Sequence, residues 1–299
     1  MQIGIIGLGK MGFNLALNLK RNKYDVVAQD VNEEFVSKIG NEEIETAYSV
    51  EELCKKLTNR KVIWLMVPAG EIVDSVIDSL LPHLTKNDII IDGGNSNYKD
   101  SKRRYSKLKE HGIDFLDCGT SGGTSGALNG ACTMIGGDAD VFEYVSDVFK
   151  NISVENGSLY TGVAGSGHFT KMVHNGIEYG MMQSIAEGFE VFEHSEFDID
   201  FHKTAKLFNH GSVVRSWLME LTENAFSKDA KLDGIKGIMH SSGEGKWTLE
   251  TALDLGVPTP VIALSIMMRY RSQMSDTFSG KVVAALRNEF GGHAVEKNE

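Results

Sequence analysis

A lysine, an asparagine and a glutamate share one face of a helix that is predicted to follow a glycine-rich turn in the second half of the chain. Lys171, Asn175 and Glu178 stand at i, i+4 and i+7, and His174 lies beside them, a spacing that aligns side chains along about two helical turns. An amine, an amide and a carboxyl group on one stripe are suited to moving protons and holding hydroxyl groups. The alternative interpretation is an ordinary solvent-exposed polar face.

A glycine motif near the first residue predicts a dinucleotide site. An apolar strand runs into Gly7-x-Gly9-x-x-Gly12, and an amphipathic helix follows. In such a motif the first glycine permits a tight turn, the second lets the backbone approach a pyrophosphate, and the third allows close packing of helix and strand. Free N–H groups at the helix N-terminus then face the phosphates. The alternative is that the glycines serve only a turn. The predicted cofactor contacts in this loop are Gly7, Leu8, Gly9, Lys10, Met11 and Gly12.

An acidic residue closes the second predicted strand. Asp30 lies eighteen positions after Gly12, where a carboxylate can accept hydrogen bonds from the adenosine ribose hydroxyls. The same carboxylate would repel a 2′-phosphate, and no arginine follows it directly. The predicted cofactor is therefore NAD, with NADP disfavoured.

Composition limits the classes of function that remain. The chain has 299 residues and is 41% hydrophobic, enough for a large core in two domains. A net charge of −11 argues against a nucleic-acid partner. No apolar run approaches the ~18 residues of a membrane span, and the sequence begins directly with a strand, so neither a span nor a leader segment is expected. The three cysteines are scattered, which predicts reduced thiols in a cytoplasmic protein without a metal centre.

The pattern of elements changes near residue 163. Strands and helices alternate before it, which predicts an α/β Rossmann-type dinucleotide-binding domain over residues 1–163, with a parallel sheet covered on both faces. Only helical periodicity follows, which predicts an all-α substrate and dimerisation domain with a C-terminal tail over residues 164–299. The predicted strands are 3–6, 25–28, 62–67, 89–91, 114–116 and 132–135. The predicted helices include 71–81, 98–110, 201–208, 217–226 and 261–274, and Pro258 and Pro260 mark the start of the last one.

Three loops at the ends of predicted strands combine small residues with polar groups. Loop 66–70 could cover the adenosine side of a cofactor, an amide in loop 92–96 could reach both ligands, and loop 119–126 offers hydroxyls and bare backbone N–H groups to an anion. Each loop alone could be a plain turn, but ligands of α/β folds bind at strand C-termini. The candidate binding residues here are Val67, Pro68, Ala69, Asn95, Ser121, Gly122 and Gly123.

Together these motifs resemble the 6-phosphogluconate dehydrogenases, within the wider group of β-hydroxyacid dehydrogenases. The resemblance continues through residues 245–248 and 256–258 and ends at 287–293, so it spans nearly the whole chain. The lysine–asparagine pair is shared by the wider group. Glu178-Tyr179 and the final Phe-Gly-Gly-His are specific to the phosphogluconate branch.

The resemblance implies an oxidative decarboxylation of 6-phospho-D-gluconate to D-ribulose 5-phosphate and CO2, with reduction of NAD, as in the pentose phosphate pathway. Lys171 would take the C3 hydroxyl proton and later polarise the ketone. Glu178 would protonate C1 of the resulting enediol. No metal ion is required in this scheme.

The resemblance also implies how the substrate is held. The predicted substrate contacts are Asn95, Ser121, Gly122, Gly123, His174, Asn175, Tyr179, Arg269, Arg287 and His293. Asn95 would contact the cofactor too, and Tyr179, Arg269 and Arg287 would bind the phosphate, with His293 nearby. In this family the tail enters a neighbouring subunit's site, which implies a homodimer or homotetramer in which the tail acts in trans.

One departure and two rival functions remain. The family usually has a lysine before Gly243 that touches the phosphate, whereas this chain has Ser242, and Glu244 would repel a phosphate that it faced. A different β-hydroxyacid dehydrogenase, such as one acting on 3-hydroxyisobutyrate, would share Lys171 and Asn175 without needing a tail histidine. A non-catalytic dinucleotide-binding regulatory protein would bind NAD without turnover.

Overall fold

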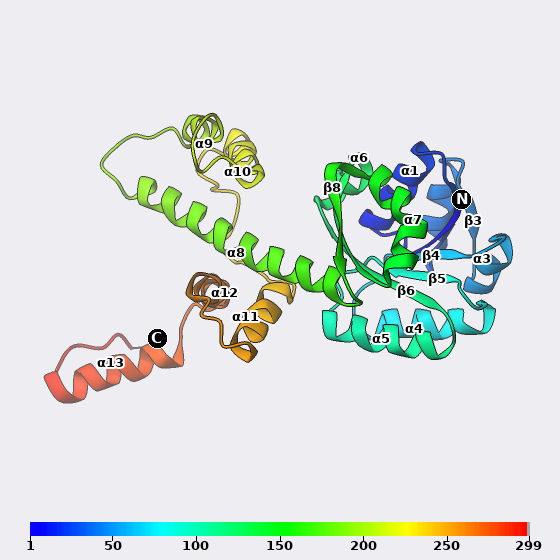
Figure 1. The fold of residues 1–299 in the computed structure, drawn as a ribbon. Coiled ribbons are helices and arrows are strands. Elements are labelled where there is room, and N and C mark those ends of the chain that lie inside the picture. Colours follow the sequence, from blue (N-terminus) through cyan, green and yellow to red (C-terminus); the bar gives the residue numbers. More distant parts are fainter. Residues whose placement is uncertain (298–299) are drawn as a thin grey trace. The chain divides into compact units, whose positions relative to one another are not determined.

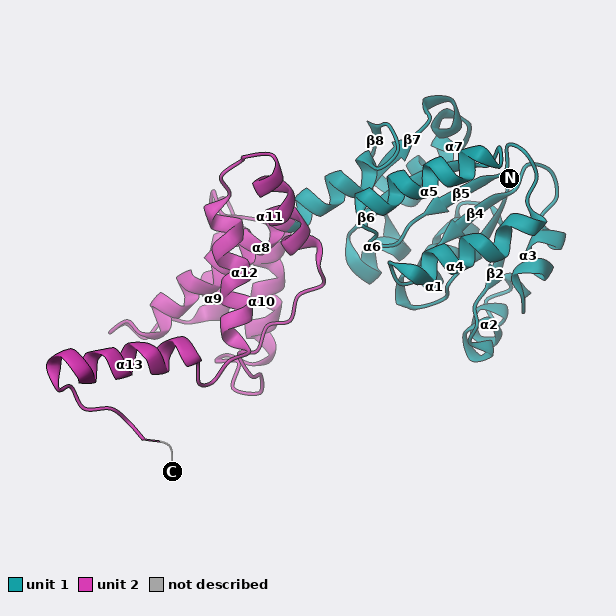
Figure 2. Ribbon diagram, turned by 90° about the horizontal axis from the view of Figure 1, so that it is seen from below, with its two compact units in different colours: residues 1–175 teal, residues 176–299 magenta. Residues whose placement is uncertain are grey.

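The computed structural model describes residues 1–297 of the chain and forms two compact units. The first unit is Met1–Asn175 and the second is Gly176–Glu299 (Figure 2). The boundary falls inside helix α8 (Ser166–Glu193), so one continuous helix contributes residues to both units. The last two positions of the predicted all-α domain, 298 and 299, lie outside the described residues.

The first unit is built on an eight-stranded sheet, counted over the described residues, in the order β3-β2-β1-β4-β5-β6-β7-β8 (Figure 1). Its strands are β1 (Gln2–Ile6), β2 (Asp25–Gln29), β3 (Glu45–Ala47), β4 (Val62–Leu65), β5 (Ile89–Asp92), β6 (Asp114–Ser121), β7 (Ala131–Gly137) and β8 (Ser153–Gly162). Neighbouring strands pair in parallel except β6 and β7, which are antiparallel.

The prediction of a wholly parallel sheet is therefore wrong at one strand pair. Strands β6 and β7 are joined only by the short helix α6 (Gly123–Asn129) and its flanking residues. A parallel neighbour needs a crossover of about a dozen residues or more, whereas a short connection returns the chain antiparallel. Two strands were not predicted at all: β3 has only three residues, and most of β8 is exposed or half-buried, so neither carries a clear apolar signal.

Helices cover both faces of the sheet, as predicted. The helices of this unit are α1 (Lys10–Arg21), α2 (Glu33–Gly40), α3 (Val50–Lys56), α4 (Glu71–Leu80), the 3-10 turn η1 (Leu81–His83), α5 (Tyr98–Glu110), α6 and α7 (Ala139–Ile152). One buried cluster joins α1, α2 and α7 to the sheet, and another joins α3, α4 and α5 to its opposite face. In α4 the buried residues Val73, Ile77 and Leu80 recur at helical spacing, which is why this segment forms an amphipathic helix.

The described part of the second unit contains helices and connecting loops but no strand. After α8 come α9 (Phe201–Asn209), α10 (Trp217–Lys228), α11 (Glu244–Asp254), α12 (Pro260–Ser272) and α13 (Phe278–Gly291). The predicted helices 201–208, 217–226 and 261–274 are confirmed, and α12 begins at Pro260. Phe189, Phe201 and Phe226 form a buried aromatic cluster with ring centroids 5.0–5.8 Å apart.

None of the helices in residues 1–297 has the combination of length and apolar character that a bilayer crossing would need. Over the same residues, no group of three or more His, Cys, Asp or Glu side chains is arranged to hold a metal ion.

Candidate functional site

The glycine loop between β1 and α1 has the shape of a phosphate cradle. Gly7 adopts φ +99°, and a Cβ there would lie 2.6 Å from the Met66 carbonyl oxygen. A Cβ on Gly9 would meet nothing within 4 Å, so the backbone is open to a ligand at this position. The first turn of α1 has no side-chain cap and no acidic residue. Its unpaired N–H groups are therefore available to a pyrophosphate, and the residues present fit a dinucleotide.

Asp30 lies at the end of β2 against this loop. Its Oδ2 accepts a hydrogen bond from the Leu8 N–H at 2.5 Å, and its Oδ1 accepts one from the Asn32 N–H at 2.8 Å. A carboxylate has about four lone-pair directions, so two backbone bonds leave room for hydroxyl donors. The geometry places the predicted ribose acceptor beside the predicted pyrophosphate cradle.

The loops after β4 and β5 lie side by side. A Cβ on Gly94 would be 3.0 Å from the Val67 carbonyl oxygen. Pro68 and Ala69 are exposed on the first loop, and Asn95 is exposed on the second. These residues, predicted to contact the cofactor, are thus presented on neighbouring surface segments at the C-terminal ends of adjacent parallel strands.

The start of α8 is anchored on β6 and β7. Asp117 in β6 is fully buried, and its carboxylate accepts hydrogen bonds from the N–H groups of Gly165 (2.6 Å) and His168 (2.8 Å). These N–H groups lie at the positive end of the helix and have no partner within it, so a buried carboxylate stabilises them. A Cβ on Gly167 would lie 2.6 Å from the Asp117 carbonyl oxygen, so only glycine permits this close contact.

The next turns of α8 bring four predicted residues together in the first unit. Lys171 is 7% exposed and lies directly against Gly119 of β6. Ser121, at the end of that strand, has its Oγ 3.3 Å from Nε2 of His174, whose Nδ1 is 2.9 Å from Oδ1 of Asn175. Since an amide oxygen only accepts, Nδ1 is the donor in the contact with Asn175. Lys171 is therefore largely withdrawn from water at the end of the strand that carries Ser121.

Two glycines extend this cluster along the backbone. Gly122 adopts a left-handed conformation at φ +110°, and Gly123 follows at φ +59°. A Cβ on Gly123 would meet nothing within 4 Å, so the loop beside Ser121 is open. The predicted anion-binding segment therefore directly follows β6, the strand against which Lys171 packs.

Residues predicted to hold the phosphate form a second group, in the helical unit. Tyr179 is buried on α8, and the guanidinium of Arg269 lies 3.7 Å from its ring centroid. The Ser242 N–H donates to the Tyr179 hydroxyl at 3.3 Å, and Arg269 donates to the His240 carbonyl at 2.7 Å. Glu178 precedes Tyr179 and is half-buried on the same helix.

A glutamate that the sequence marked as a departure is also buried here. Glu244 is the first residue of α11 and is 4% exposed, and its Oε2 has no hydrogen-bond partner. Gly245, its neighbour, packs so closely on Tyr179 that a Cβ would lie 2.6 Å from the ring.

The two predicted tail residues lie at the end of α13. The His293 N–H donates to the Arg287 carbonyl at 3.4 Å, and the Asn288 amide donates to the His293 carbonyl at 2.9 Å. None of the residues of α13 is buried. Among residues 1–297, Arg287 and His293 make no hydrogen bond or ring contact with Tyr179 or Arg269. One chain therefore does not bring all the residues of the predicted phosphate site into contact.

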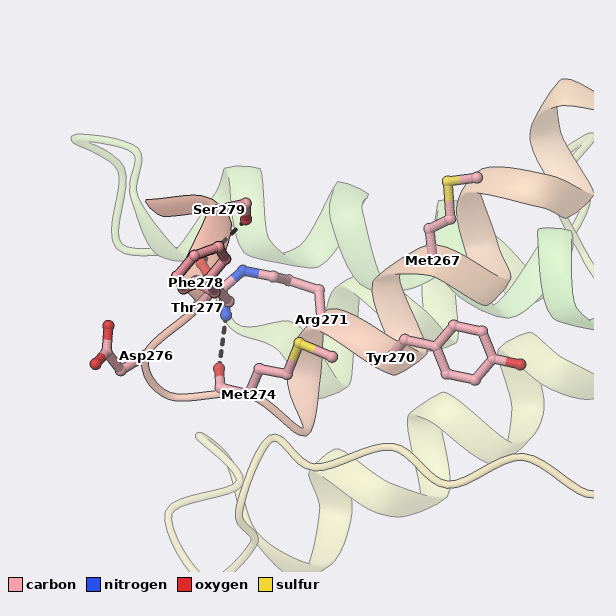
Figure 3. Close-up of a pocket in the computed structure, with 8 residues that line it drawn as sticks. All are labelled: Met267, Tyr270, Arg271, Met274, Asp276, Thr277, Phe278 and Ser279. Atoms are coloured by element: carbon pink, nitrogen blue, oxygen red, sulfur yellow. Dashed lines mark hydrogen bonds between the residues drawn. The ribbon is translucent and has the colours of Figure 1, made fainter. Parts of the chain in front are cut away.

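A hollow of about 470 Å³ opens where α12 leads into α13 (Figure 3). Arg271 crosses it and donates to the Met274 carbonyl at 2.6 Å. Its lining contains no predicted site residue and consists of Met267, Tyr270, Arg271, Met274, Asp276, Thr277, Phe278 and Ser279.

Two residues that sequence reasoning missed are central to the first unit. Asp117 anchors the helix of the predicted base, and Arg104 of α5 is fully buried among carboxylates behind the loops that follow β4 and β5. An aspartate inside an apolar strand and an arginine on the buried face of a helix were the available signals, because charged residues are rarely buried without partners.

Both halves of the chain match known families. Residues 2–165 match the family described as the NAD binding domain of 6-phosphogluconate dehydrogenase. Residues 167–299 match the family described as the 6-phosphogluconate dehydrogenase C-terminal domain.

Full-length relatives agree with these matches. YqeC of Bacillus subtilis, provisionally named a 6-phosphogluconate dehydrogenase, is 60% identical over 297 residues, covering 99% of this chain and 100% of its own. The NAD(+)-dependent, decarboxylating 6-phosphogluconate dehydrogenase of Haloferax volcanii is 40% identical over 301 residues, covering 100% of both chains. The structure of Plasmodium falciparum 6-phosphogluconate dehydrogenase matches with a TM-score of 0.85 at 32% identity, covering 100% of this chain and 67% of that one. With both halves matched and relatives aligned over its whole length, this chain belongs to the 6-phosphogluconate dehydrogenase family.

Proposed function

We propose that this protein catalyses the oxidative decarboxylation of 6-phospho-D-gluconate to D-ribulose 5-phosphate and CO2, with NAD as the oxidant. The observation that carries the proposal is the position of Lys171. It is buried on α8 against β6, beside the Ser121–His174–Asn175 hydrogen bonds. Strand β6 belongs to the same sheet as β1, which runs into the open glycine loop.

Each side chain has a defined role in this scheme. Bound NAD supplies the hydride acceptor. Neutral Lys171 takes the proton of the C3 hydroxyl while the C3 hydride departs, which leaves a 3-keto acid. The protonated amine then gives its proton to the oxygen at C3 as the carboxylate leaves as CO2 and the electron pair forms an enediol. Glu178 delivers a proton to the carbon that carried the carboxylate, which is C1 of the enediol. Lys171 takes back the hydroxyl proton of the neighbouring carbon, and the ketose product results.

The preference for NAD rests on Asp30. Its carboxylate lies against the glycine loop, where an adenosine ribose would present its hydroxyls. A 2′-phosphate at this position would face a fixed negative charge, and the residues that follow, from Val31 to Glu34, supply no cation to balance it.

The phosphate end of the substrate needs more than one chain in this proposal. Tyr179 and Arg269 of one copy bind the substrate phosphate together with Arg287 and His293 of a second copy. The assembly is a homodimer or homotetramer. The fully exposed α13 supports this arrangement, since Phe278, Val282, Leu286 and Phe290 are all exposed at four-residue intervals along it. The three free cysteines support a cytoplasmic setting.

A substrate panel tests the function. The purified protein is assayed with 6-phosphogluconate, gluconate, 3-hydroxyisobutyrate and other small hydroxyacids, with NAD and NADP in parallel, and CO2 is measured beside NADH. We expect turnover with 6-phosphogluconate alone, one CO2 for each reduced cofactor, and a higher kcat/KM with NAD. Equal or faster turnover of an unphosphorylated hydroxyacid would reject the proposal, and NAD binding without any turnover would favour a regulatory protein.

A further inference from the structure

Arg104 is a fully buried charge in the nucleotide-binding unit with five hydrogen-bond contacts. It lies on α5 and its side chain is 0% exposed. It donates to the loop after β4 and the start of α4, and also to the end of β5 and the loop that follows it. On the side of β4 it contacts the Gly70 carbonyl at 2.9 Å and both oxygens of Asp74 at 3.0 and 3.1 Å. On the side of β5 it contacts Oδ2 of Asp92 at 3.2 Å and the Ser96 Oγ at 3.1 Å.

This set of contacts uses every donor that the side chain has. A guanidinium carries five N–H bonds in a rigid planar fork, and the five distances above account for five donor–acceptor pairs. A lysine in the same place would offer a single ammonium group on a flexible stem, so it could not hold both loops in one geometry. The arrangement therefore links the two loops at a fixed separation and does more than neutralise one carboxylate.

Asn95 lies in the loop after β5, between two residues that bond to the same carboxylate. Asp92 accepts the Ser96 hydroxyl at 2.8 Å and the Gly94 N–H at 3.2 Å, so both neighbours of Asn95 are tied to one buried carboxylate. Ser96 is 4% exposed, while Asn95 itself is exposed. The exposed Asn95 thus stands between two residues that bond to Asp92, and Arg104 is the cation that pairs with this carboxylate.

We propose that Arg104 is a positioning residue that sets the place of Asn95 relative to the loop following β4, and so aligns cofactor and substrate for hydride transfer. The inference deepens the proposed function and rests on it for the role of Asn95. Placement errors of about 1 Å in a reacting complex can cost on the order of 100-fold in rate, so a link between these loops has a large effect on turnover.

Arg103 supplies a matched control on the same helix. It also bonds Asp74, through both Nη atoms at 3.1 and 2.8 Å, but its side chain is 53% exposed and it pairs further with Asp100 on the same helix. Removing Arg103 therefore removes an ion pair with the same carboxylate and leaves the link to the Asn95 loop in place.

The test is a double-mutant cycle between Arg104→Lys and Asn95→Ala. We expect Arg104→Lys to lower kcat/KM for NAD at least tenfold when Asn95 is present. When Asn95 is already alanine, the fold-loss caused by Arg104→Lys should be smaller by a factor of at least three. Arg103→Ala is expected to stay within twofold of its parent in both backgrounds. Losses from Arg104→Lys that agree within threefold in the two backgrounds would overturn the inference, because general damage to the fold would act equally in both.

Two further measurements keep the result unambiguous. Each variant is checked by circular dichroism and thermal unfolding, and if Arg104→Lys does not fold, Ser96→Ala carries the same comparison with the arginine intact. The cycle is repeated with NADH affinity measured by fluorescence, which needs no turnover. If the wild type binds NADH but does not oxidise 6-phosphogluconate, the proposed function fails, while the coupling between Arg104 and Asn95 is still measured.

Discussion

Replacing Gly119 by alanine should displace the predicted base without touching the dinucleotide loop. A Cβ at this position in β6 would lie 2.3 Å from the Cβ of Lys171 and 2.9 Å from the Gly167 carbonyl oxygen. Carbon atoms normally approach to about 3.5–4.0 Å, so a gap of more than 1 Å must open. The Cβ of Lys171 is fixed to the helix backbone, so the start of α8 must move with it.

The size of the effect follows from this displacement. Overpacking of this kind typically costs about 1–3 kcal/mol of folding free energy, which a domain of normal stability survives. A misplacement of about 1 Å at a reacting group can cost on the order of 100-fold in rate, equivalent to about 2.7 kcal/mol of activation free energy. We therefore expect a folded Gly119→Ala protein whose kcat with 6-phosphogluconate falls about 100-fold and whose affinity for NADH stays within about twofold.

The assay combines initial rates of NADH formation with NADH titration by fluorescence. Gly188→Ala is the matched control, because this exposed glycine lies on the same helix and a Cβ there would meet nothing within 4 Å. It should stabilise the protein by about 0.5–1 kcal/mol and leave kcat unchanged. A folded Gly119→Ala protein with more than half of the wild-type kcat would refute the placement of Lys171 at the reacting centre.

Three more outcomes follow from the structure. Glu178→Gln should lower kcat about 100-fold with KM for 6-phosphogluconate nearly unchanged in steady-state assays; a large rise in KM at normal kcat would make it a binding residue only. Asp30→Ala should lower the NAD to NADP ratio of kcat/KM about tenfold, and an unchanged ratio would remove this residue from cofactor choice. Burial alone would raise the pKa of Asp74, but hydrogen bonds from Arg104 and Arg103 hold that pKa well below its ordinary value. The stability gained from its ionised form is therefore present above about pH 4 and is lost as the pH falls below it. Asp74→Asn should flatten the acid limb of the unfolding free energy measured by urea titration, and an acid limb as steep as that of the wild type would contradict this.

The strongest sequence signals were those that need only short-range regularity. The glycine loop, the strand that ends at Asp30 and the helix that carries Lys171 are each set by spacing within a dozen or so residues, and the structure has all three. The amphipathic helices were found for the same reason, because apolar residues recur at 3.6-residue intervals along them.

What the sequence did not predict depends on contacts between distant segments. The antiparallel pairing of β7 with β6 follows from the short connection between them. The length of this connection fixes the strand direction only when β6 and β7 are known to be neighbours in the sheet. Asp117 and Arg104 looked like isolated charges, and their roles emerge only where β6 meets α8 and where α5 passes behind the loops after β4 and β5. Arg287 and His293 were predicted from a family resemblance, and their part in a site remains a proposal about a second copy.

The most direct test of the central claim is the turnover of Lys171→Ala with 6-phosphogluconate and NAD, measured beside its NADH affinity. We expect a loss of at least about 1,000-fold in kcat in a folded protein that binds NADH within about twofold of the wild type. Retention of most of the wild-type kcat would contradict it, because no other group has been assigned the proton of the C3 hydroxyl.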